Sequence, residues 1–322
     1  MAKMRKRNTK NLFKPINKKA LVIGITGQDG INLTKLLLKK NFSVIGVSRN
    51  IKKAHAKLSK TLKLNKITIF DENFFKLDST EKFLIKHKPK YIFFLAGQSS
   101  VGRSFERPME TYNSNIMPVM NILEYIRKFS NQTRIYNSSS SEIFGNQGKK
   151  KLNEKSNYFP ISPYGSAKAI TTDLIKSYRE SFEIKAYNGI CFNHESIHRN
   201  SNFLFGKLLK ILKTTKNKKV KFGSSSIVRD WGLSEEYVSA FLKIILSKQP
   251  DDYVIATGRS YSIKEVFIKI LGKKNFNKKI IFDENLKRPN EIFFSYADPR
   301  KIKKKLNWKA RKYVTDIFKN ND

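Results

Sequence analysis

Tyr164 and Lys168 stand four positions apart in the segment SPYGSAK at residues 162–168. In a helix this spacing places both side chains on one face. A lysine cation beside a tyrosine stabilises the phenolate, so we expect the pKa of Tyr164 to be lowered. Such a phenolate could accept the proton of a substrate hydroxyl while hydride leaves the same carbon. A tyrosine and a lysine at this spacing also occur by chance, so the interpretation depends on the surrounding elements.

Four consecutive serines followed by Glu142 form a second candidate, in the segment YNSSSSEIFG at residues 136–145. A serine run is usually a solvated loop. Here residues 134–136 read as the end of a strand, and Ile143 and Phe144 are too apolar for a linker. These flanking residues argue against a spacer and leave the rim of an active site as the other interpretation, which depends on the rest of the chain.

Three glycines, Gly24, Gly27 and Gly30, lie between a predicted strand at residues 20–25 and a predicted helix at residues 32–40. Glycines here permit a tight turn and close backbone approach to a pyrophosphate, and the helix N-terminus offers N–H groups to the anion. The spacing differs from the common GxGxxG, so an ordinary strand-to-helix turn remains the alternative. Its position in the first βα unit favours dinucleotide binding. We expect cofactor contacts from Gly24, Thr26, Gly27, Gln28, Asp29 and Gly30.

The residue after the second predicted strand, residues 42–47, bears on the choice of cofactor. An acidic residue there would bind the ribose 2′-hydroxyl of NAD, whereas a cation accommodates the 2′-phosphate of NADP. The sequence has Arg49 at this place, which favours NADP. The alternative is one more surface arginine in a basic protein.

Strand-like and helix-like segments alternate along the first 192 residues. Further strands are predicted at 67–70, 91–95, 134–139 and 185–192, and helices at 79–88, 110–129 and 164–182. Repeated βα units with short loops indicate an α/β fold, a Rossmann-type doubly wound parallel sheet. The alternation then loosens, which predicts a smaller C-terminal α/β substrate-binding lobe. We expect a basic arm at 1–18, a cofactor-binding domain at 19–192 to which some later segments return, and mainly the lobe at 193–322.

Composition limits the classes of function. The 322 residues carry a formal net charge of +39, but the cations are mostly lysines spread along the whole chain, so nucleic-acid binding is the weaker interpretation. The positive field would still attract an anionic metabolite. No apolar stretch is long enough for a membrane span, and the N-terminus lacks the apolar core of a secretory signal. The single Cys191 argues against an internal disulfide or a cysteine-rich metal site, and we expect a cytoplasmic protein.

Nearly the whole chain, from about residue 19 to 310, resembles the extended short-chain dehydrogenase/reductases and, more closely, the GDP-mannose 4,6-dehydratases. The matching segments are GITGQDG at 24–30, LAGQSSV at 95–101, SSSSEIFG at 138–145, SPYGSAK at 162–168, NGICFNHES at 188–196, RDWG at 229–232, DDYVIATG at 251–258 and RPNE at 288–291. The resemblance implies GDP-mannose as the substrate, NADP as the cofactor and a homodimer or homotetramer.

The resemblance also implies a role for each candidate residue. Tyr164 would accept the proton of the sugar 4-hydroxyl, and Lys168 would hold the nicotinamide ribose. Ser140, where the family usually has threonine, would bind the 4-oxygen. Glu142 would remove the C5 proton before water leaves from C6, a step that a simple reductase or epimerase does not need; a capping or salt-bridging carboxylate is the alternative. Further cofactor contacts are implied for Leu95, Ala96, Gln98, His194 and Arg199, and substrate contacts for Ser100, Asn193, Lys207, Arg229, Arg288 and Glu291.

Several positions depart from the family pattern. Asn50 replaces the second of two arginines, Phe75 and Lys76 replace an Asp-Leu pair near the adenine, and Ile161 and Ile197 replace residues beside the catalytic segments. The lobe is also shorter between Leu271 and Arg288. These departures leave a related nucleotide-sugar dehydratase, epimerase or reductase, or a non-catalytic descendant of the fold, as alternatives.

Overall fold

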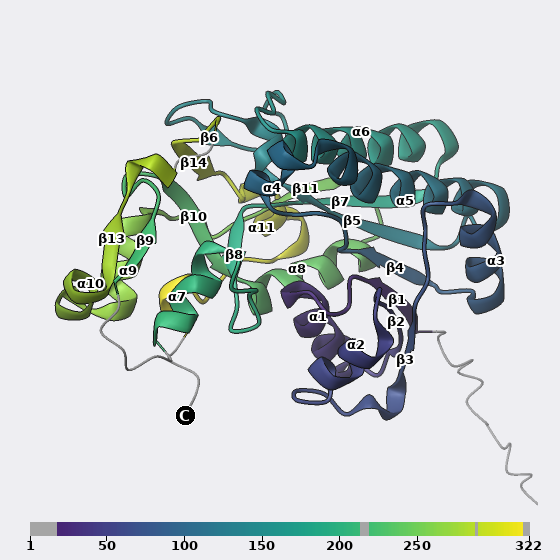
Figure 1. The fold of residues 1–322 in the computed structure, drawn as a ribbon. Coiled ribbons are helices and arrows are strands. Elements are labelled where there is room, and N and C mark those ends of the chain that lie inside the picture. Colours follow the sequence, from purple (N-terminus) through teal and green to yellow (C-terminus); the bar gives the residue numbers. More distant parts are fainter. Residues whose placement is uncertain (1–17, 213–218, 287–288, 318–322) are drawn as a thin grey trace, which may run out of the picture.

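A seven-stranded parallel sheet forms the centre of the computed structural model, which describes residues 18–212, 219–286 and 289–317 (Figure 1). The strand order is β11-β7-β5-β4-β1-β2-β3. These strands are β1 (Lys19–Ile23), β2 (Ser43–Val47), β3 (Ile67–Phe70), β4 (Tyr91–Phe94), β5 (Arg134–Ser140), β7 (Lys185–Cys191) and β11 (Asp252–Ile255). The order reverses between β1 and β4, so the doubly wound sheet expected from the sequence is confirmed.

Helices cover both faces of this sheet, because successive residues of a strand point to opposite faces. Ala20 and Val22 of β1 belong to the core under α1 (Gln28–Lys39), α2 (Ile51–Leu58) and α8 (Ser234–Leu246). Leu21 and Ile23 belong to the core under α3 (Leu77–His87), α5 (Pro108–Phe129) and α6 (Pro163–Phe182). Figure 1 shows the two helical layers above and below the strands. Both faces of β1 are therefore buried, as its uninterrupted apolar run predicts.

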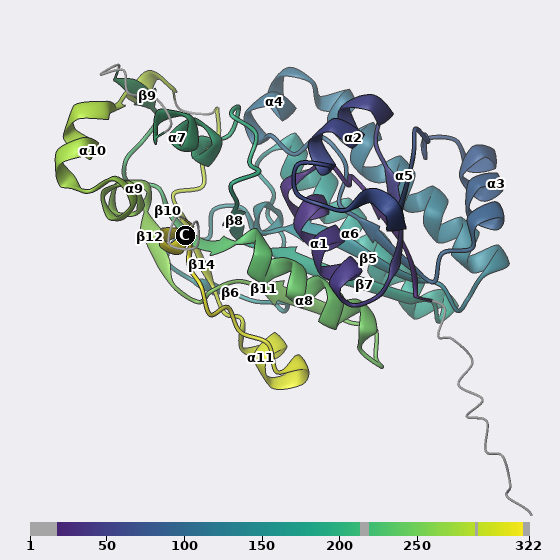
Figure 2. The same ribbon diagram turned by 90° about the horizontal axis from the view of Figure 1, so that it is seen from below.

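A smaller lobe is built around a second sheet, with strand order β12-β10-β14-β6 and β8 paired to β10. Its core packs Phe205, Trp231 and Phe267 together. The strands are β6 (Lys151–Leu152), β8 (Asn193–Glu195), β10 (Val228–Leu233), β12 (Ser260–Ser262) and β14 (Phe294–Ala297), and a separate pair joins β9 (Val220–Phe222) to β13 (Ile280–Phe282). The helices are α7 (Leu204–Leu212), α9 (Ile263–Leu271) and α10 (Lys273–Lys279). Figure 2 shows this lobe beside the edge of the large sheet that carries β11.

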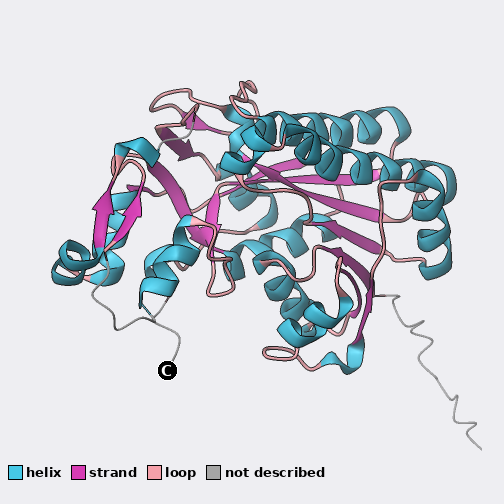
Figure 3. Ribbon diagram, viewed as in Figure 1, coloured by secondary structure: helices cyan, strands magenta, loops and turns pink. Residues whose placement is uncertain are grey.

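The remaining elements are short helices. They are α4 (Val101–Glu106), α11 (Arg300–Leu306) and four short 3-10 helices, η1 (Leu64–Lys66), η2 (Ser141–Phe144), η3 (Glu284–Leu286) and η4 (Val314–Asp316). The chain passes between the parts more than once: β6 precedes α6 but lies in the lobe sheet, and β11 follows β10 but pairs with β7. Figure 3 distinguishes helices and strands across both parts. Within the described ranges, no helix combines the length and apolarity that a membrane crossing requires.

Candidate active site

The candidate residues meet at the carboxyl ends of the parallel strands. The turn at Gly24 follows β1, Leu95 and Ala96 follow β4, the serines end β5, and Asn193 follows β7. In doubly wound sheets, ligands bind at this edge, where the strand order reverses. The N-terminal turn of α6 adds Tyr164 to the same place. The fold thus brings together segments that are up to about 170 positions apart in the sequence.

Lys168 lies buried beneath the end of β5. Its Nζ donates a hydrogen bond to the carbonyl oxygen of Ser138 over 2.9 Å and lies 5.9 Å from the centre of the Tyr164 ring. Burial lowers the pKa of Lys168 to about 8, because desolvation disfavours the ammonium form. The lysine is therefore fixed beside the tyrosine, as the spacing predicts, but its amine is directed at the strand.

The pKa of Tyr164 is raised above its ordinary value, which contradicts the lowered pKa expected from the sequence. Burial is the largest cause; a hydrogen bond with the Ser140 side chain opposes it, and the negative charge of Glu142 adds to it. The sequence argument treated Lys168 as the dominant neighbour and could not include the desolvation of the phenol. The phenol is neutral in the protein chain itself.

Ser140 and Glu142 lie in the same cluster as Tyr164. The Ser140 side chain forms a hydrogen bond with the Tyr164 hydroxyl, and an added Cβ on Gly165, the residue after Tyr164, would lie 2.8 Å from the Glu142 carbonyl oxygen. Glu142 is half-buried on η2, and its backbone N–H donates to the Ser140 Oγ over 3.2 Å. Gly145 then ends the turn with a φ of +63°, where an added Cβ would lie 1.8 Å from the Phe159 carbonyl oxygen. The first three serines thus end β5 and the fourth begins η2, so the interpretation of the run as a flexible spacer is wrong.

The glycine turn has the geometry that a dinucleotide requires. Gly24 has a φ of +93°, and an added Cβ on Gly30 would lie 2.3 Å from the Gly24 carbonyl oxygen. Helix α1 begins at Gln28, and no side chain caps its N-terminus, so its first N–H groups are directed out of the helix end. These features fit the diphosphate of a nicotinamide dinucleotide.

His194 and Asp29 form an ion pair behind this turn, with 12% and 20% of their side-chain surface exposed. The His194 Nε2 lies 3.0 and 3.1 Å from the two Asp29 carboxylate oxygens, and its Nδ1 lies 2.8 Å from the Phe192 carbonyl oxygen. Both partners are acceptors, so both ring nitrogens must donate and the ring is an imidazolium. Burial lowers the pKa of His194, but the charge of Asp29 and the hydrogen bonds with Asp29 and with the Phe192 carbonyl oxygen together outweigh this and raise it overall. The Asp29 pKa, despite burial, is lowered by His194.

This pair ties the glycine turn to the lobe. Ser234 donates to the Asp29 Oδ1 over 2.7 Å, and Gln28 donates to the His194 carbonyl oxygen over 2.9 Å. Asp29, Gln28 and His194 were expected to contact the cofactor; their side chains bind one another and hold the turn in place. The ring of Tyr237 stacks on His194 with centres 4.5 Å apart.

We predict that His194→Phe destabilises the protein by roughly 1–3 kcal/mol, because the phenyl ring keeps the stacking on Tyr237 but the Asp29 carboxylate loses its hydrogen-bonded ion-pair partner. The raised His194 pKa contributes stability that is lost as the pH rises through the folded value, and the lowered Asp29 pKa contributes stability that is lost as the pH falls through its folded value. The free energy of unfolding by urea, measured across pH, should therefore decline in the parent, but not in the variant, as the pH rises through the raised pKa of His194. An equal decline in both would contradict the ion pair.

In the segment between β4 and α4, polar side chains form hydrogen bonds with the backbone of the same segment. Gln98 donates to the Ser100 carbonyl oxygen over 2.9 Å, and Ser100 caps α4 by accepting from the N–H of Arg103. Leu95 and Ala96 pass within 3.1 Å of where a Cβ on Gly24 would lie. Asn115 of α5, which sequence reasoning missed, donates to the Gln98 carbonyl oxygen, and its Oδ1 is buried without a hydrogen-bond partner among the described residues. An isolated Asn in a helical segment gave no signal for this role.

Three of the predicted ligand contacts are engaged in internal ion pairs. Arg229 is 4% exposed and its guanidinium lies 3.1 Å from the Glu291 carboxylate, so the structure brings these two predicted substrate residues together. Arg199 lies 3.0 Å from Glu195 and covers the Phe203 ring, so its guanidinium makes contacts within the chain. The other predicted substrate contacts are scattered: Asn193 is half-buried in β8, Lys207 is exposed on α7, and Arg288 lies outside the described residues.

The segment after β2 forms a helix that the sequence analysis did not predict. Asn50 begins α2, and its side chain accepts from the Lys53 N–H over 2.9 Å. Arg49 is exposed immediately before this cap. From the last turn of α2, Lys57 donates to the Thr26 carbonyl oxygen over 2.8 Å. Lys57 is therefore a cation beside the glycine turn that sequence reasoning missed, since nothing separates it from the other lysines.

The other departures from the family pattern lie around these segments. Phe75 and Lys76 are exposed before α3, Ile197 is exposed, and the carbonyl oxygen of Ile161 accepts from the Asn290 side chain over 3.2 Å.

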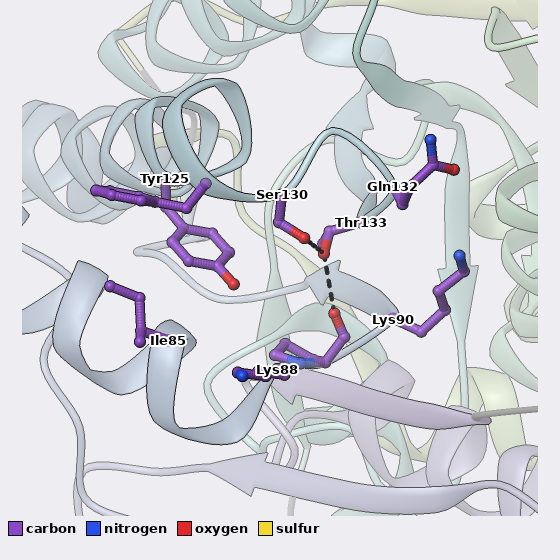
Figure 4. Close-up of a pocket in the computed structure, with 9 residues that line it drawn as sticks. Ile85, Lys88, Lys90, Tyr125, Ser130, Gln132 and Thr133 are labelled. Carbon is purple, nitrogen blue, oxygen red and sulfur yellow. Dashed lines mark hydrogen bonds between the residues drawn. The ribbon is translucent and has the colours of Figure 1, made fainter.

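A recess of about 440 Å³ lies at the opposite edge of the sheet, at the amino ends of β4 and β5 (Figure 4). Lys88, Lys90 and Tyr125 line it, and Thr133 donates to the Pro89 carbonyl oxygen within its wall. Because the catalytic candidates lie at the carboxyl ends of these strands, we do not assign this recess to the reaction.

Comparisons with known proteins extend this picture. The family model described as GDP-mannose 4,6 dehydratase matches residues 21–320. GDP-mannose 4,6 dehydratase 1 of Arabidopsis thaliana is 33% identical over 94% of this chain and 87% of its own length. The human GDP-mannose 4,6 dehydratase is 32% identical over 91% of this chain and 87% of its own length.

Solved structures show the same fold at lower identity. A Thermotoga maritima UDP-glucose 4-epimerase with UDP-glucose has a TM-score of 0.81 and 22% identity, covering 92% of this chain and 95% of its own. A dTDP-glucose 4,6-dehydratase from Bacillus anthracis in complex with NAD has a TM-score of 0.79 and 17% identity, covering 94% of this chain and 97% of its own.

Proposed function

The chain belongs to the GDP-mannose 4,6-dehydratase family, and from this premise we propose that it converts GDP-mannose to GDP-4-dehydro-6-deoxymannose. The observation that carries the proposal is the cluster of Ser140, Glu142 and Tyr164 at the sheet edge beside a dinucleotide-type glycine turn. A phenol alone suits an oxidoreductase, whereas removal of water also needs a base for the carbon next to the new ketone.

Each residue of the cluster carries out a different step of the proposed reaction. A bound nicotinamide cofactor supplies the redox chemistry, accepting hydride from C4 of the sugar and returning it at C6. Ser140 binds the 4-oxygen and Tyr164 accepts its proton; the oxidised ring's positive charge nearby favours the phenolate, which the protein alone disfavours. The resulting ketone acidifies the C5 proton. Glu142 removes that proton and passes it to the C6 hydroxyl, which leaves as water; C5 then takes a proton from solvent when hydride is returned to C6. Lys168, held by Ser138, positions the tyrosine and the cofactor ribose.

Incubation with GDP-mannose and NADP tests the proposal directly. We expect a 4-keto-6-deoxy sugar nucleotide by mass spectrometry, eighteen mass units lighter than the substrate because one water is lost. UDP-glucose and dTDP-glucose serve as competing substrates. Turnover of either of these in preference to GDP-mannose, by folded and cofactor-loaded protein, would contradict the assignment.

NADP is proposed as the cofactor because Arg49 follows β2, where a 2′-phosphate lies in Rossmann-type domains. We predict that Arg49→Ser raises the Kd for NADP about tenfold and leaves the Kd for NAD within about twofold. Lys52→Ser, which removes another exposed cation from the first turn of α2, is the matched control and should change neither. Fluorescence titration measures all four affinities. A parent protein that binds NAD as tightly as NADP would overturn the proposal.

A homodimer or homotetramer is proposed as the assembly. Helices α5 and α6 pack side by side and expose large apolar side chains, among them Met117 at 37% and Phe182 at 47% of their full surface. Exposed apolar patches on neighbouring helices are typical of protein interfaces. Light scattering that gives the mass of a single chain at micromolar concentration would contradict this.

A further inference from the structure

A second recess, of about 600 Å³, lies where the end of β11, the start of α11 and the segment after α11 meet. Five of its lining residues are cations: Arg259, Arg300, Lys303, Lys309 and Arg311. Within the described residues, no carboxylate lines it. Figure 2 shows α11 on the side of the molecule away from α2 and α4.

Three of these cations have no side-chain partner in the part of the chain that the structure describes. The Nε of Arg300 donates hydrogen bonds to both carboxylate oxygens of Asp298, and its Nη2 donates to one of them over 2.7 Å. The guanidinium carbon of Arg259 lies 4.8 Å from the centre of the Tyr313 ring. The side chains of Lys303, Lys309 and Arg311 are exposed and have no hydrogen-bond or ion-pair partner among the described residues. Like charges gathered in one recess repel each other, and a bound anion would remove that repulsion.

The recess is separated from the substrate residues by β10. Arg229 and Asp230 are adjacent in this strand, so their side chains point to opposite faces. Arg229 binds Glu291 on one side, whereas the buried Asp230 carboxylate accepts from the N–H groups of Thr257 and Gly258 over 2.9 and 2.7 Å on the other. Thr257 itself lines the recess. An anion bound there would therefore not occupy the position of the sugar nucleotide.

We propose that this recess is a second anion site, for a small phosphorylated ligand bound through its diphosphate. Two arginines flank these three side chains: Arg259 lies over the Tyr313 ring, and Arg300 donates to Asp298 through Nε and Nη2, which leaves its Nη1 to donate to a phosphate oxygen. The aromatic rings of the recess are covered, since Tyr313 lies under Arg259 and Trp308 is 4% exposed. A nucleobase therefore has no open ring to stack on, and recognition rests on the phosphates.

Calorimetric titration with pyrophosphate tests the site, in the presence of saturating NADP and GDP so that the catalytic cleft is filled. The variant K303S/K309S/R311S leaves the Arg300 and Arg259 contacts intact, and we expect it to weaken pyrophosphate binding at least about tenfold. The control K273S/K274S/K278S removes three exposed cations from α10, so it changes net charge equally, and should bind within about twofold of the parent.

Equal loss of affinity in both variants, or no binding by the parent, would overturn the proposal, because the attraction would then reflect only overall charge. ADP distinguishes a free anion site from a nucleotide site: we expect ADP to bind no more tightly than pyrophosphate, and a clear gain from the adenosine would overturn the assignment to the phosphates alone. These titrations measure binding without turnover, so they stand whether or not the dehydratase activity is found.

Discussion

Glu142→Gln is expected to lower the rate of water loss about 10²–10⁴-fold, the usual contribution of a positioned proton acceptor. Glutamine keeps the size of the side chain on η2 but cannot accept the C5 proton. Because Tyr164 is unchanged, C4 oxidation should continue and the reaction should stop at the ketone. Near-ultraviolet absorbance of reduced nicotinamide should then accumulate in a single turnover, and solvent deuterium should no longer enter C5.

Glu180→Gln is the matched control, since Glu180 is an exposed carboxylate on α6 and lies outside the cluster. It should retain the parent rate and the parent deuterium incorporation. Full turnover by Glu142→Gln, with deuterium still entering C5, would show that another group removes this proton. The chain would then lack the feature that distinguishes it from a simple oxidoreductase.

Tyr164→Phe is expected to reduce kcat about 10²–10⁴-fold with little change in KM, because it removes the hydroxyl that accepts the substrate proton and leaves the ring in place. Here the block precedes oxidation, so no reduced nicotinamide should accumulate. Rapid-mixing absorbance therefore separates this variant from Glu142→Gln, even though both lack product.

Tyr158→Phe provides the comparison for loss of a phenol hydroxyl. Tyr158 packs edge-on against Phe144, with ring centres 5.9 Å apart, and lies outside the catalytic cluster. It should keep most of the parent activity. Reduced nicotinamide formed at the parent rate by Tyr164→Phe would exclude this tyrosine as the proton acceptor.

The large sheet and its helices could be predicted from the sequence because each strand is a short apolar run followed by a helical pattern. Strand β3 lies at its predicted bounds, and α5 begins two residues before its predicted start, at a proline that suits the first helical turn. The lobe strands were harder. β10 carries Arg229 and Asp230 within the sheet, where their partners come from residues far along the chain, so no local pattern marked them as buried.

The electrostatics of the site could be predicted only in part. Residue types placed Tyr164, Lys168 and Glu142 together, since their segments end neighbouring strands or begin the following helix. The raised pKa of Tyr164 and the pairing of Asp29 with His194 depend on burial and on contacts between distant segments. Helix α2 was missed because its lysine-rich sequence buries only Ala54 and Leu58.

The repeated passage of the chain between the two sheets has a consequence during synthesis on the ribosome. Strand β7 remains an open edge, and Tyr136 of β5 remains uncovered, until β11 and the Phe241 side chain of α8 have emerged. We therefore expect that the large sheet cannot complete its folding before the residues of α8 and β11 have been synthesised. A chain terminated before β11 would expose the unpaired backbone N–H and C=O groups of β7, which can pair with another chain. We therefore expect nascent copies of this protein to depend on chaperones late in translation.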